Sequence, residues 1–254
     1  MANQNEKELA GRAAAKLVVD GTIVGLGTGS TAYFAVVALG ERVKDGLKII
    51  GIPTSVATGE LARAVGIPLS TLDQHPEIDI TIDGADEVDP QLRLIKGGGG
   101  ALLREKIIAT ASKRMVVVAD SSKLVPALGK FPLPVEIIPF ARAVIERNIT
   151  ALGASCKLRN RPDGTPFVTD EGHHILDCSF GKIADPPALA RALSEMPGVV
   201  EHGLFIGIAK AAIIGKGNSV VEIGQKRARP PASRRRPTRV KRVVKKRVAK
   251  HSRR

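Results

Sequence analysis

The first half of the chain alternates between two kinds of hydrophobic pattern. Short continuous apolar runs predict strands at 22–27, 47–52, 68–72, 78–83 and 115–119. Segments with apolar residues at helical spacing predict helices at 5–19, 30–44, 55–65 and 104–112, with Ser30 capping the second of them. Strands that alternate with helices favour a parallel sheet covered by helices on both faces.

The pattern changes after Phe131-Pro132-Leu133-Pro134. Extended segments are predicted at 135–138, 154–158, 167–169, 174–178 and 199–204, and helices at 140–152 and 187–196. This order predicts a small α+β, ferredoxin-like domain at 131–206. Two later apolar runs, 211–214 and 220–223, are expected to return to the first sheet. Residues 1–130 plus 207–225 would then form a Rossmann-like catalytic domain, so the fold class is α/β.

The net charge of +14 comes from the end of the chain. Fifteen of the 39 Lys and Arg residues lie in 226–254, which holds no Asp or Glu, leaving 24 basic against 25 acidic residues in the rest. Like charges at this density repel and bury no core, so residues 226–254 are predicted to be a disordered basic tail. The tail is a candidate contact for nucleic acid or another polyanion, and a solvated tail without a specific partner is the alternative. The near-neutral body gives no reason to expect nucleic-acid binding.

Several features indicate a cytoplasmic protein. The N-terminal residues are polar and lack the apolar run of a secretory signal. The uncharged stretch 21–40 is interrupted by the polar, glycine-rich residues 27–31, which do not suit a membrane span. Cys156 and Cys178 have no zinc-like spacing and are expected to be reduced. No metal site is predicted.

The segment Gly25-Leu26-Gly27-Thr28-Gly29-Ser30-Thr31-Ala32 joins a predicted strand to a predicted helix. A glycine turn at a helix N-terminus directs several backbone N–H groups, and the positive end of the helix dipole, toward an anion. Phosphate binding is the favoured interpretation. A dinucleotide site is a second interpretation, although the strand ending Ile50-Gly51-Ile52-Pro53 carries no acid to hold a ribose. A purely structural turn is a third.

Two further motifs combine charge with backbone freedom. Asp83-Gly84-Ala85-Asp86-Glu87-Val88-Asp89 follows an apolar strand, so its carboxylates could bind sugar hydroxyls, act as general acids or hold Mg²⁺, or form a solvated turn. Lys96-Gly97-Gly98-Gly99-Gly100 precedes the helix that carries Glu105. Consecutive glycines allow close approach of the main chain to a ligand, and a flexible loop is the alternative.

Together these runs resemble ribose-5-phosphate isomerase of the A type. Ala119-Asp120-Ser121-Ser122-Lys123, Leu128 to Glu136 and Pro197-Gly198-Val199-Val200 match the same family, over about residues 5–225. The resemblance implies an aldose–ketose isomerase that interconverts ribose 5-phosphate and ribulose 5-phosphate through an enediolate, without metal or cofactor. It also implies a homo-oligomer, commonly a dimer.

The resemblance also assigns roles to residues of this chain. Glu105 matches the catalytic base, Lys96 the cation beside O1 and O2, and Asp83 a group placed for proton transfer to hydroxyl or ring oxygens. The implied substrate-binding residues are Thr28, Gly29, Ser30, Thr31, Asp83, Gly84, Ala85, Asp86, Lys96, Gly97, Gly98, Gly99 and Lys123. Thr28 to Thr31 are assigned mainly to the phosphate.

Two hypotheses from other classes stay open at this point. Sugar-phosphate-sensing domains of transcription regulators share this fold type, and such a sensor would bind ligand without turnover while the tail contacts DNA. An enzyme whose tail associates with nucleic acid would show binding that falls steeply with salt. A dinucleotide-dependent oxidoreductase is disfavoured by the missing acid after the second strand.

Overall fold

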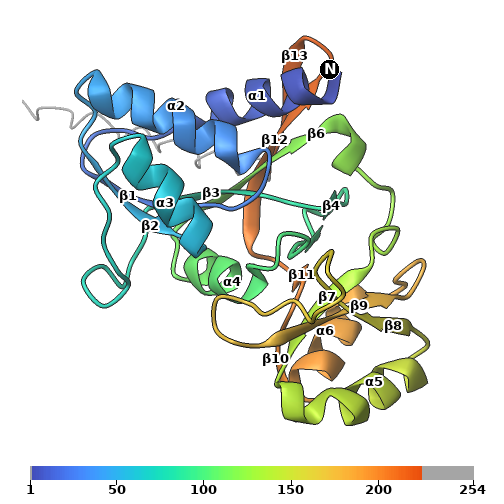
Figure 1. Ribbon diagram of the computed structural model, residues 1–254. Coiled ribbons are helices and arrows are strands. Elements are labelled where there is room, and N and C mark those ends of the chain that lie inside the picture. Colours follow the sequence, from blue (N-terminus) through green and yellow to red (C-terminus); the bar gives the residue numbers. More distant parts are fainter. Residues whose placement is uncertain (1, 225–254) are drawn as a thin grey trace, which may run out of the picture.

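Two main sheets organise the computed structural model, which describes residues 2–224 (Figure 1). The helices are α1 (Ala2–Ala15), α2 (Ala32–Lys44), α3 (Val56–Ala64), α4 (Leu102–Thr110), α5 (Arg142–Ala151) and α6 (Pro186–Ser194), with short 3-10 turns at Ser121–Lys123 and Pro139–Ala141. The strands of the larger sheet are β1 (Thr22–Leu26), β2 (Ile49–Pro53), β3 (Ile80–Gly84), β6 (Met115–Asp120), β12 (Ala209–Lys216) and β13 (Ser219–Gly224).

The larger sheet has the order β13-β12-β6-β3-β1-β2, in which only β13 runs antiparallel to its neighbour. All six residues of β6 are buried, as expected for a central strand covered on both faces. On one face α1, α2 and α3 pack against β1, β3 and β6 through an aliphatic core that includes Leu26, Leu39 and Val116. The predicted α/β class is therefore confirmed, as is the return of the last two strands to this sheet.

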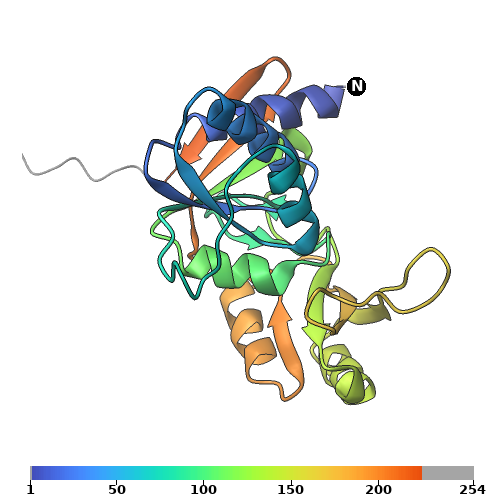
Figure 2. The same ribbon diagram turned by 60° about the vertical axis from the view of Figure 1, so that its left-hand side comes forward.

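The smaller sheet contains β7 (Leu133–Ile137), β8 (Ser155–Leu158), β9 (His174–Ser179) and β10 (Val199–His202). Its antiparallel order is β10-β7-β9-β8, and with α5 and α6 it follows the chain order β-α-β-β-α-β. This is the ferredoxin-like arrangement that the sequence predicts. In Figure 2 the small sheet lies below the larger one, with α4 at the boundary between them. The domain boundaries at 130/131 and 206/207 stay a prediction.

Some predicted elements differ from the structure. The run at 68–72 forms one bridge, between Gly51 and Leu69, because it meets the edge strand at a single point. The segment 167–169 is a loop beside a bridge between Asn160 and Pro166, so the described residues between α5 and α6 contribute two strands, β8 and β9, to the small sheet. The first helix ends at Ala15 rather than near residue 19. The predicted disorder of 226–254 lies outside the described residues.

A third sheet was not predicted. It has the order β11-β5-β4 and consists of β4 (Glu87–Val88), β5 (Leu94–Ile95) and β11 (Leu204–Phe205). It places Lys96, which directly follows β5, beside Gly203, whose carbonyl accepts the Lys96 N–H at 2.9 Å. The sheet therefore fixes the start of the glycine loop against the small domain.

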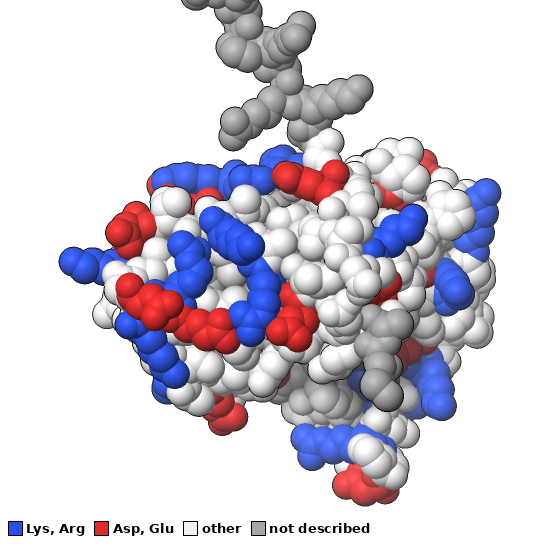
Figure 3. All heavy atoms as spheres, turned by 90° about the horizontal axis from the view of Figure 1, so that it is seen from above, with Lys and Arg blue, Asp and Glu red and all other residues white. Residues whose placement is uncertain are grey.

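The face formed by α1 and α2 carries charges of both signs (Figure 3). Arg12 pairs with Glu8 at 2.8 Å and with Glu41 at 2.6 Å, which joins the two helices across the surface. Pairs of this exposed kind contribute about 0–1 kcal/mol each. The mixture agrees with the near-neutral charge counted for the body and does not form a patch of one sign.

Candidate active site

A pocket opens at the carboxyl ends of β1, β3 and β6. In the order of the sheet, β2 lies next to β1 on one side and β3 lies next to β1 on the other. The direction of strand order therefore reverses at β1, so β1 and β3 flank a topological switch point. Ligands of open α/β sheets bind at such points. The pocket encloses about 450 Å³ including its opening to solvent, and is lined by Thr28, Gly29, Ser30, Thr31, Gly84, Ala85, Asp86, Lys96, Gly97, Gly98, Gly99, Glu105 and Lys123.

Every predicted site residue except Asp83 belongs to this lining. Asp83 is fully buried and lies behind Lys96. Its Oδ1 atom accepts the N–H of Thr28 at 3.0 Å and that of Gly84 at 2.7 Å. Its Oδ2 atom lies 3.0 Å from Lys96 Nζ. The fold therefore brings the predicted residues together in two layers. One layer lines the pocket, and Asp83 lies beneath it.

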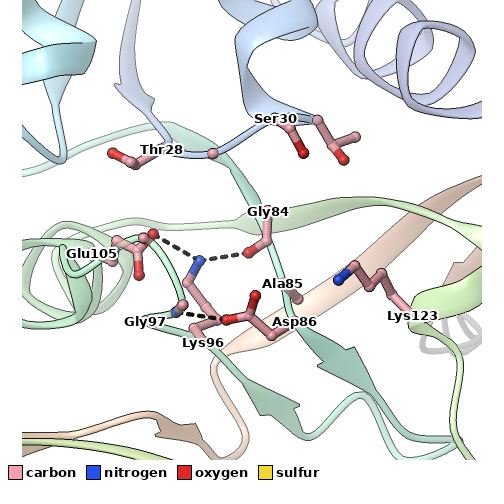
Figure 4. Close-up of a pocket in the computed structure, with 13 residues that line it drawn as sticks. Thr28, Ser30, Gly84, Ala85, Asp86, Lys96, Gly97, Glu105 and Lys123 are labelled. Atoms are coloured by element: carbon pink, nitrogen blue, oxygen red, sulfur yellow. Dashed lines mark hydrogen bonds and ion pairs between the residues drawn. The ribbon is translucent and has the colours of Figure 1, made fainter. Parts of the chain in front are cut away.

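Lys96 is the centre of the charged cluster (Figure 4). Its side chain is 2% exposed, and its Nζ atom lies 3.2 Å from Glu105 Oε1 and also donates to the Gly84 carbonyl. Glu105, in the first turn of α4, is 4% exposed, and its Oε2 atom has no hydrogen-bond partner among the described residues. One ammonium thus joins two buried carboxylates, and one oxygen of Glu105 stays available for a proton.

Burial changes the proton affinities of all three groups. Loss of solvent and, after it, the negative charge of Asp83 raise the pKa of Glu105 to about 8, against an opposing effect of Lys96. Burial likewise raises the pKa of Asp83. For Lys96 burial alone would lower the pKa, but the carboxylates of Asp83 and Glu105 outweigh it and the pKa is raised. The cluster thus holds a permanent cation beside a carboxyl group that titrates near neutral pH.

The turn after β1 packs tightly against β3. A Cβ atom on Gly27 would lie 2.4 Å from the Cα atom of Asp83, so the close approach of the two chains requires glycine. Thr28 lines the pocket, but its hydroxyl group bonds to Thr54 at 2.7 Å and Ser55 at 2.8 Å. Since its N–H donates to Asp83, Thr28 already has partners for its polar groups, and these bonds favour a supporting role.

The opposite wall of the pocket suits an anion. Thr31, rather than Ser30, is the N-cap of α2 and makes no side-chain capping bond, so the predicted Ser30 cap is wrong. The hydroxyls of both residues are therefore free of the cap, next to the positive end of the helix dipole. Figure 4 shows Lys123, which follows β6, reaching toward the same pocket from the side of Asp86. Hydroxyls, a helix N-terminus and an ammonium are groups that bind phosphate.

The glycine loop forms a turn on the floor of the pocket. The Gly100 N–H donates to the Gly97 carbonyl at 3.0 Å, and both residues have positive φ, at 84° and 98°. Asp86 accepts the Gly98 N–H at 2.8 Å. The turn is therefore ordered by specific bonds, which argues against the flexible-loop interpretation.

Sequence reasoning missed one neighbour of the cluster. The Phe205 ring, fully buried on β11, lies near two ammonium groups, with its centroid 5.4 Å from Lys96 Nζ and 5.0 Å from Lys106 Nζ. Aromatic faces attract cations at such distances. No local pattern indicated this contact, because Phe205 is more than one hundred residues from Lys96 in the chain.

The comparisons with known proteins agree on one family. The family model "Ribose 5-phosphate isomerase A (phosphoriboisomerase A)" matches residues 50–219. A relative named ribose-5-phosphate isomerase A, from Parvibaculum lavamentivorans, is 56% identical over 226 residues, covering 86% of this chain and 98% of its own. The chain belongs to the ribose 5-phosphate isomerase A family.

Solved structures agree with this assignment. A D-ribose-5-phosphate isomerase in complex with phospho-erythronic acid is 40% identical, with a TM-score of 0.86 over 89% of this chain and all of its own. The ribose 5-phosphate isomerase A of Methanocaldococcus jannaschii is 41% identical, with a TM-score of 0.83 over 86% of this chain and 98% of its own.

In residues 2–224, no three or more His, Cys, Asp or Glu side chains are grouped so that they could hold a metal ion. Within the same range, no helix has the length and apolar character needed to cross a membrane.

Proposed function

We propose that this protein interconverts ribose 5-phosphate and ribulose 5-phosphate in the pocket described above. The observation that carries the proposal is the buried cluster in which Lys96 contacts both Asp83 and Glu105. The reaction moves one proton between adjacent carbons and creates negative charge on their oxygens. A carboxylate with one unpaired oxygen and a fixed ammonium are the two groups that this chemistry needs.

The steps balance without an external reactant. The open-chain aldose loses the proton on C2 to Glu105 Oε2, and the electron pair forms a C1–C2 double bond while O1 gains negative charge. Lys96 stabilises the resulting enediolate. A proton moves from O2 to O1, and Glu105 returns its proton to C1, which gives the ketose. Because the charge arises beside a fixed cation, the barrier is lowered without the help of a metal ion.

Asp83 acts through Lys96 in this proposal. It accepts two backbone N–H groups and pairs with the ammonium, so it fixes the position of Lys96 from behind. A role in proton transfer to the sugar ring, which the family resemblance implies, requires Asp83 to be reached through the layer of Lys96. The positioning role needs no such movement.

In this proposal the substrate phosphate binds at the N-terminus of α2. Gly29, Ser30 and Thr31 supply donors there, and Lys123 adds a charge from the side of Asp86. A solved relative binds phospho-erythronic acid. We expect the same compound to compete with ribose 5-phosphate here, because its carboxylate places two oxygens and a negative charge where the enediolate has them.

The direct test incubates the purified chain with ribose 5-phosphate in the presence of a chelator and detects the ketose. Formation of ribulose 5-phosphate that phospho-erythronic acid inhibits competitively supports the proposal. A run in ordinary water with substrate deuterated at C2 shows whether the label is retained at C1, as a single shuttling carboxyl predicts. Binding of the sugar phosphate without any ketose would instead support the sensor hypothesis.

The same proposal extends to the location, the oligomeric state and the basic segment of the protein. We propose that the protein works in the cytoplasm and as a homodimer, which light scattering of the full chain can test. We also propose that the basic segment 226–254, which lies outside the described residues, contacts a polyanion. Removal of 226–254 should then abolish salt-sensitive binding to a nucleic-acid duplex and leave isomerase activity unchanged.

A further inference from the structure

One arginine of the small domain contacts the glycine loop of the pocket. Arg159 directly follows β8, and its Nη1 atom donates to the carbonyl of Gly97 at 2.9 Å and to that of Gly98 at 3.2 Å. The guanidinium is held by Asp177 on β9, which accepts from Nε at 3.0 Å and also from Nη2. A carboxylate that accepts from both Nε and Nη2, along one edge of a guanidinium, fixes the plane of that group. Arg159 and Asp177 thus form a rigid bridge from the small sheet to the glycine loop.

The bridge determines which way the peptide groups of the loop face. In a trans peptide the C=O and N–H point in opposite directions. Arg159 holds the Gly97 carbonyl, and the N–H of the same peptide, on Gly98, donates to Asp86 on the other side. Arg159 also holds the Gly98 carbonyl, so the N–H of Gly99 faces away from Arg159. Gly99 lines the pocket, and its N–H has no partner among the residues the structure describes.

Other contacts tie the loop between β8 and β9 to the catalytic helix. This loop, gold in Figure 1, extends from the small sheet to below α4. Its Phe167 ring occupies the space next to Gly100, where a Cβ atom would lie 2.5 Å away, and also lies 5.9 Å from the Arg159 guanidinium. Glu171 pairs with Arg104, the residue before Glu105. The small domain therefore contacts the pocket floor at both of its ends.

We propose that Arg159 is a positioning residue for the isomerase reaction, in which it orients the Gly97–Gly99 peptides so that the Gly99 N–H donates to an oxygen of the bound sugar phosphate. The inference rests on the proposed function. Arg159 does not touch substrate; it acts through the backbone of the loop that begins at Lys96 and leads to Glu105. Small displacements of such groups have large effects on rate.

The test compares Arg159→Met with Arg161→Ala, an exposed arginine of the same loop. For Arg159→Met we expect kcat/KM to fall about tenfold to a hundredfold, the range for a lost charge-assisted hydrogen bond, with kcat reduced as well. We expect the Kd for phospho-erythronic acid to rise about tenfold. Millimolar guanidinium should restore part of the rate of Arg159→Ala, whereas equal sodium should not. Arg161→Ala should behave as the parent protein.

Two outcomes would overturn the inference. One is an Arg159→Met protein with kcat/KM and Kd within twofold of the parent. The other is a loss of rate without guanidinium rescue and with unchanged Kd, since that indicates a general structural role. If Arg159→Met does not fold, Asp177→Asn replaces it, with a smaller effect of the same sign. A parent protein without turnover would reject the proposed function but not this inference. The Kd for phospho-erythronic acid would then still test the role of Arg159.

Discussion

Lys96 Nζ lies 3.0 Å from Asp83 Oδ2 in a place where neither side chain is more than 2% exposed. Loss of either partner at this depth destabilises the fold, because an uncompensated charge then stays buried. The arrangement thus commits Lys96 to its charged form. The second carboxylate beside it, Glu105, must then share one cation with Asp83, and burial raises the pKa of both carboxyl groups.

The first prediction concerns the pH dependence of the rate. A base must be ionised to accept a proton, and burial together with the charge of Asp83 raises the pKa of Glu105 to about 8. We therefore expect kcat/KM of the free enzyme to increase as pH rises from 6, to be half-maximal near pH 8, and to level off about one pH unit higher. A continuous assay of ketose formation over pH 5.5–9.5 measures this. A flat profile down to pH 5.5 would contradict the assignment.

The second prediction separates binding from turnover. Glu105→Gln keeps the volume and a hydrogen-bond acceptor for Lys96 but cannot take a proton. We expect kcat to fall about 10²- to 10⁴-fold, the usual contribution of a general base, while the Kd for phospho-erythronic acid changes little. Glu60→Gln, an exposed glutamate of α3, is the matched control and should keep the parent rate. Near-parental turnover of Glu105→Gln would remove Glu105 from the mechanism.

Part of this site follows from the sequence, because the motifs at residues 25–32 and 83–89 directly follow apolar strands. Parallel strands end at one edge of a sheet, which explains why Thr28, Asp86 and Lys123 meet there. The layering of the site was not predictable. No sequence pattern predicts that Asp83 lies behind Lys96, or that the Thr28 hydroxyl group forms hydrogen bonds with Thr54 and Ser55.

The missed fold elements have a common physical reason. Strands of two residues, such as β4 and β5, are too short to show any periodicity, and they form only because another segment pairs with them. The Arg159 bridge joins residues 62 positions apart, and the Phe205 contact spans an even longer stretch. Such contacts depend on how the small domain docks, which local pattern does not encode.

The third prediction tests the electrostatic role of Asp83. Its charge is the second cause of the raised pKa of Glu105, after burial. In Asp83→Asn that charge is gone and Lys96 pairs with Glu105 alone, so we expect the pKa of Glu105 to fall. The acid limb of the pH–rate profile should therefore move to lower pH, and the maximal rate should drop about tenfold to a hundredfold as Lys96 loses its support. An unshifted limb would show that Asp83 does not act on Glu105.

The fourth prediction links the same group to stability. A carboxyl whose pKa is raised from 4.5 in the unfolded chain to about 8 binds its proton more tightly when folded. The free energy of unfolding contributed by Glu105 is therefore lost as pH rises from 4.5 to 8. Glu105→Gln removes this titration. We expect its Tm to fall less steeply than that of the parent between pH 5 and 8, and parallel curves from calorimetry would refute the prediction.

The last prediction uses two glycines in different environments. A Cβ atom on Gly27 would overlap the backbone of Asp83 at 2.4 Å, whereas one on Gly59, in α3, meets its nearest atom at 3.5 Å. Gly27→Ala must push β1 away from β3, so we expect a loss of about 1–3 kcal/mol in the free energy of unfolding. Gly59→Ala adds a helix-favouring residue whose Cβ atom would be in ordinary van der Waals contact with Pro53, and it should stabilise by about 0.5–1 kcal/mol. Urea denaturation of both variants measures the difference, and equal stability of the two variants would show that the β1–β3 contact can relax.

The same two variants should also differ in turnover. Because Asp83 supports Lys96, we expect Gly27→Ala to lower kcat. Gly59→Ala should leave kcat unchanged.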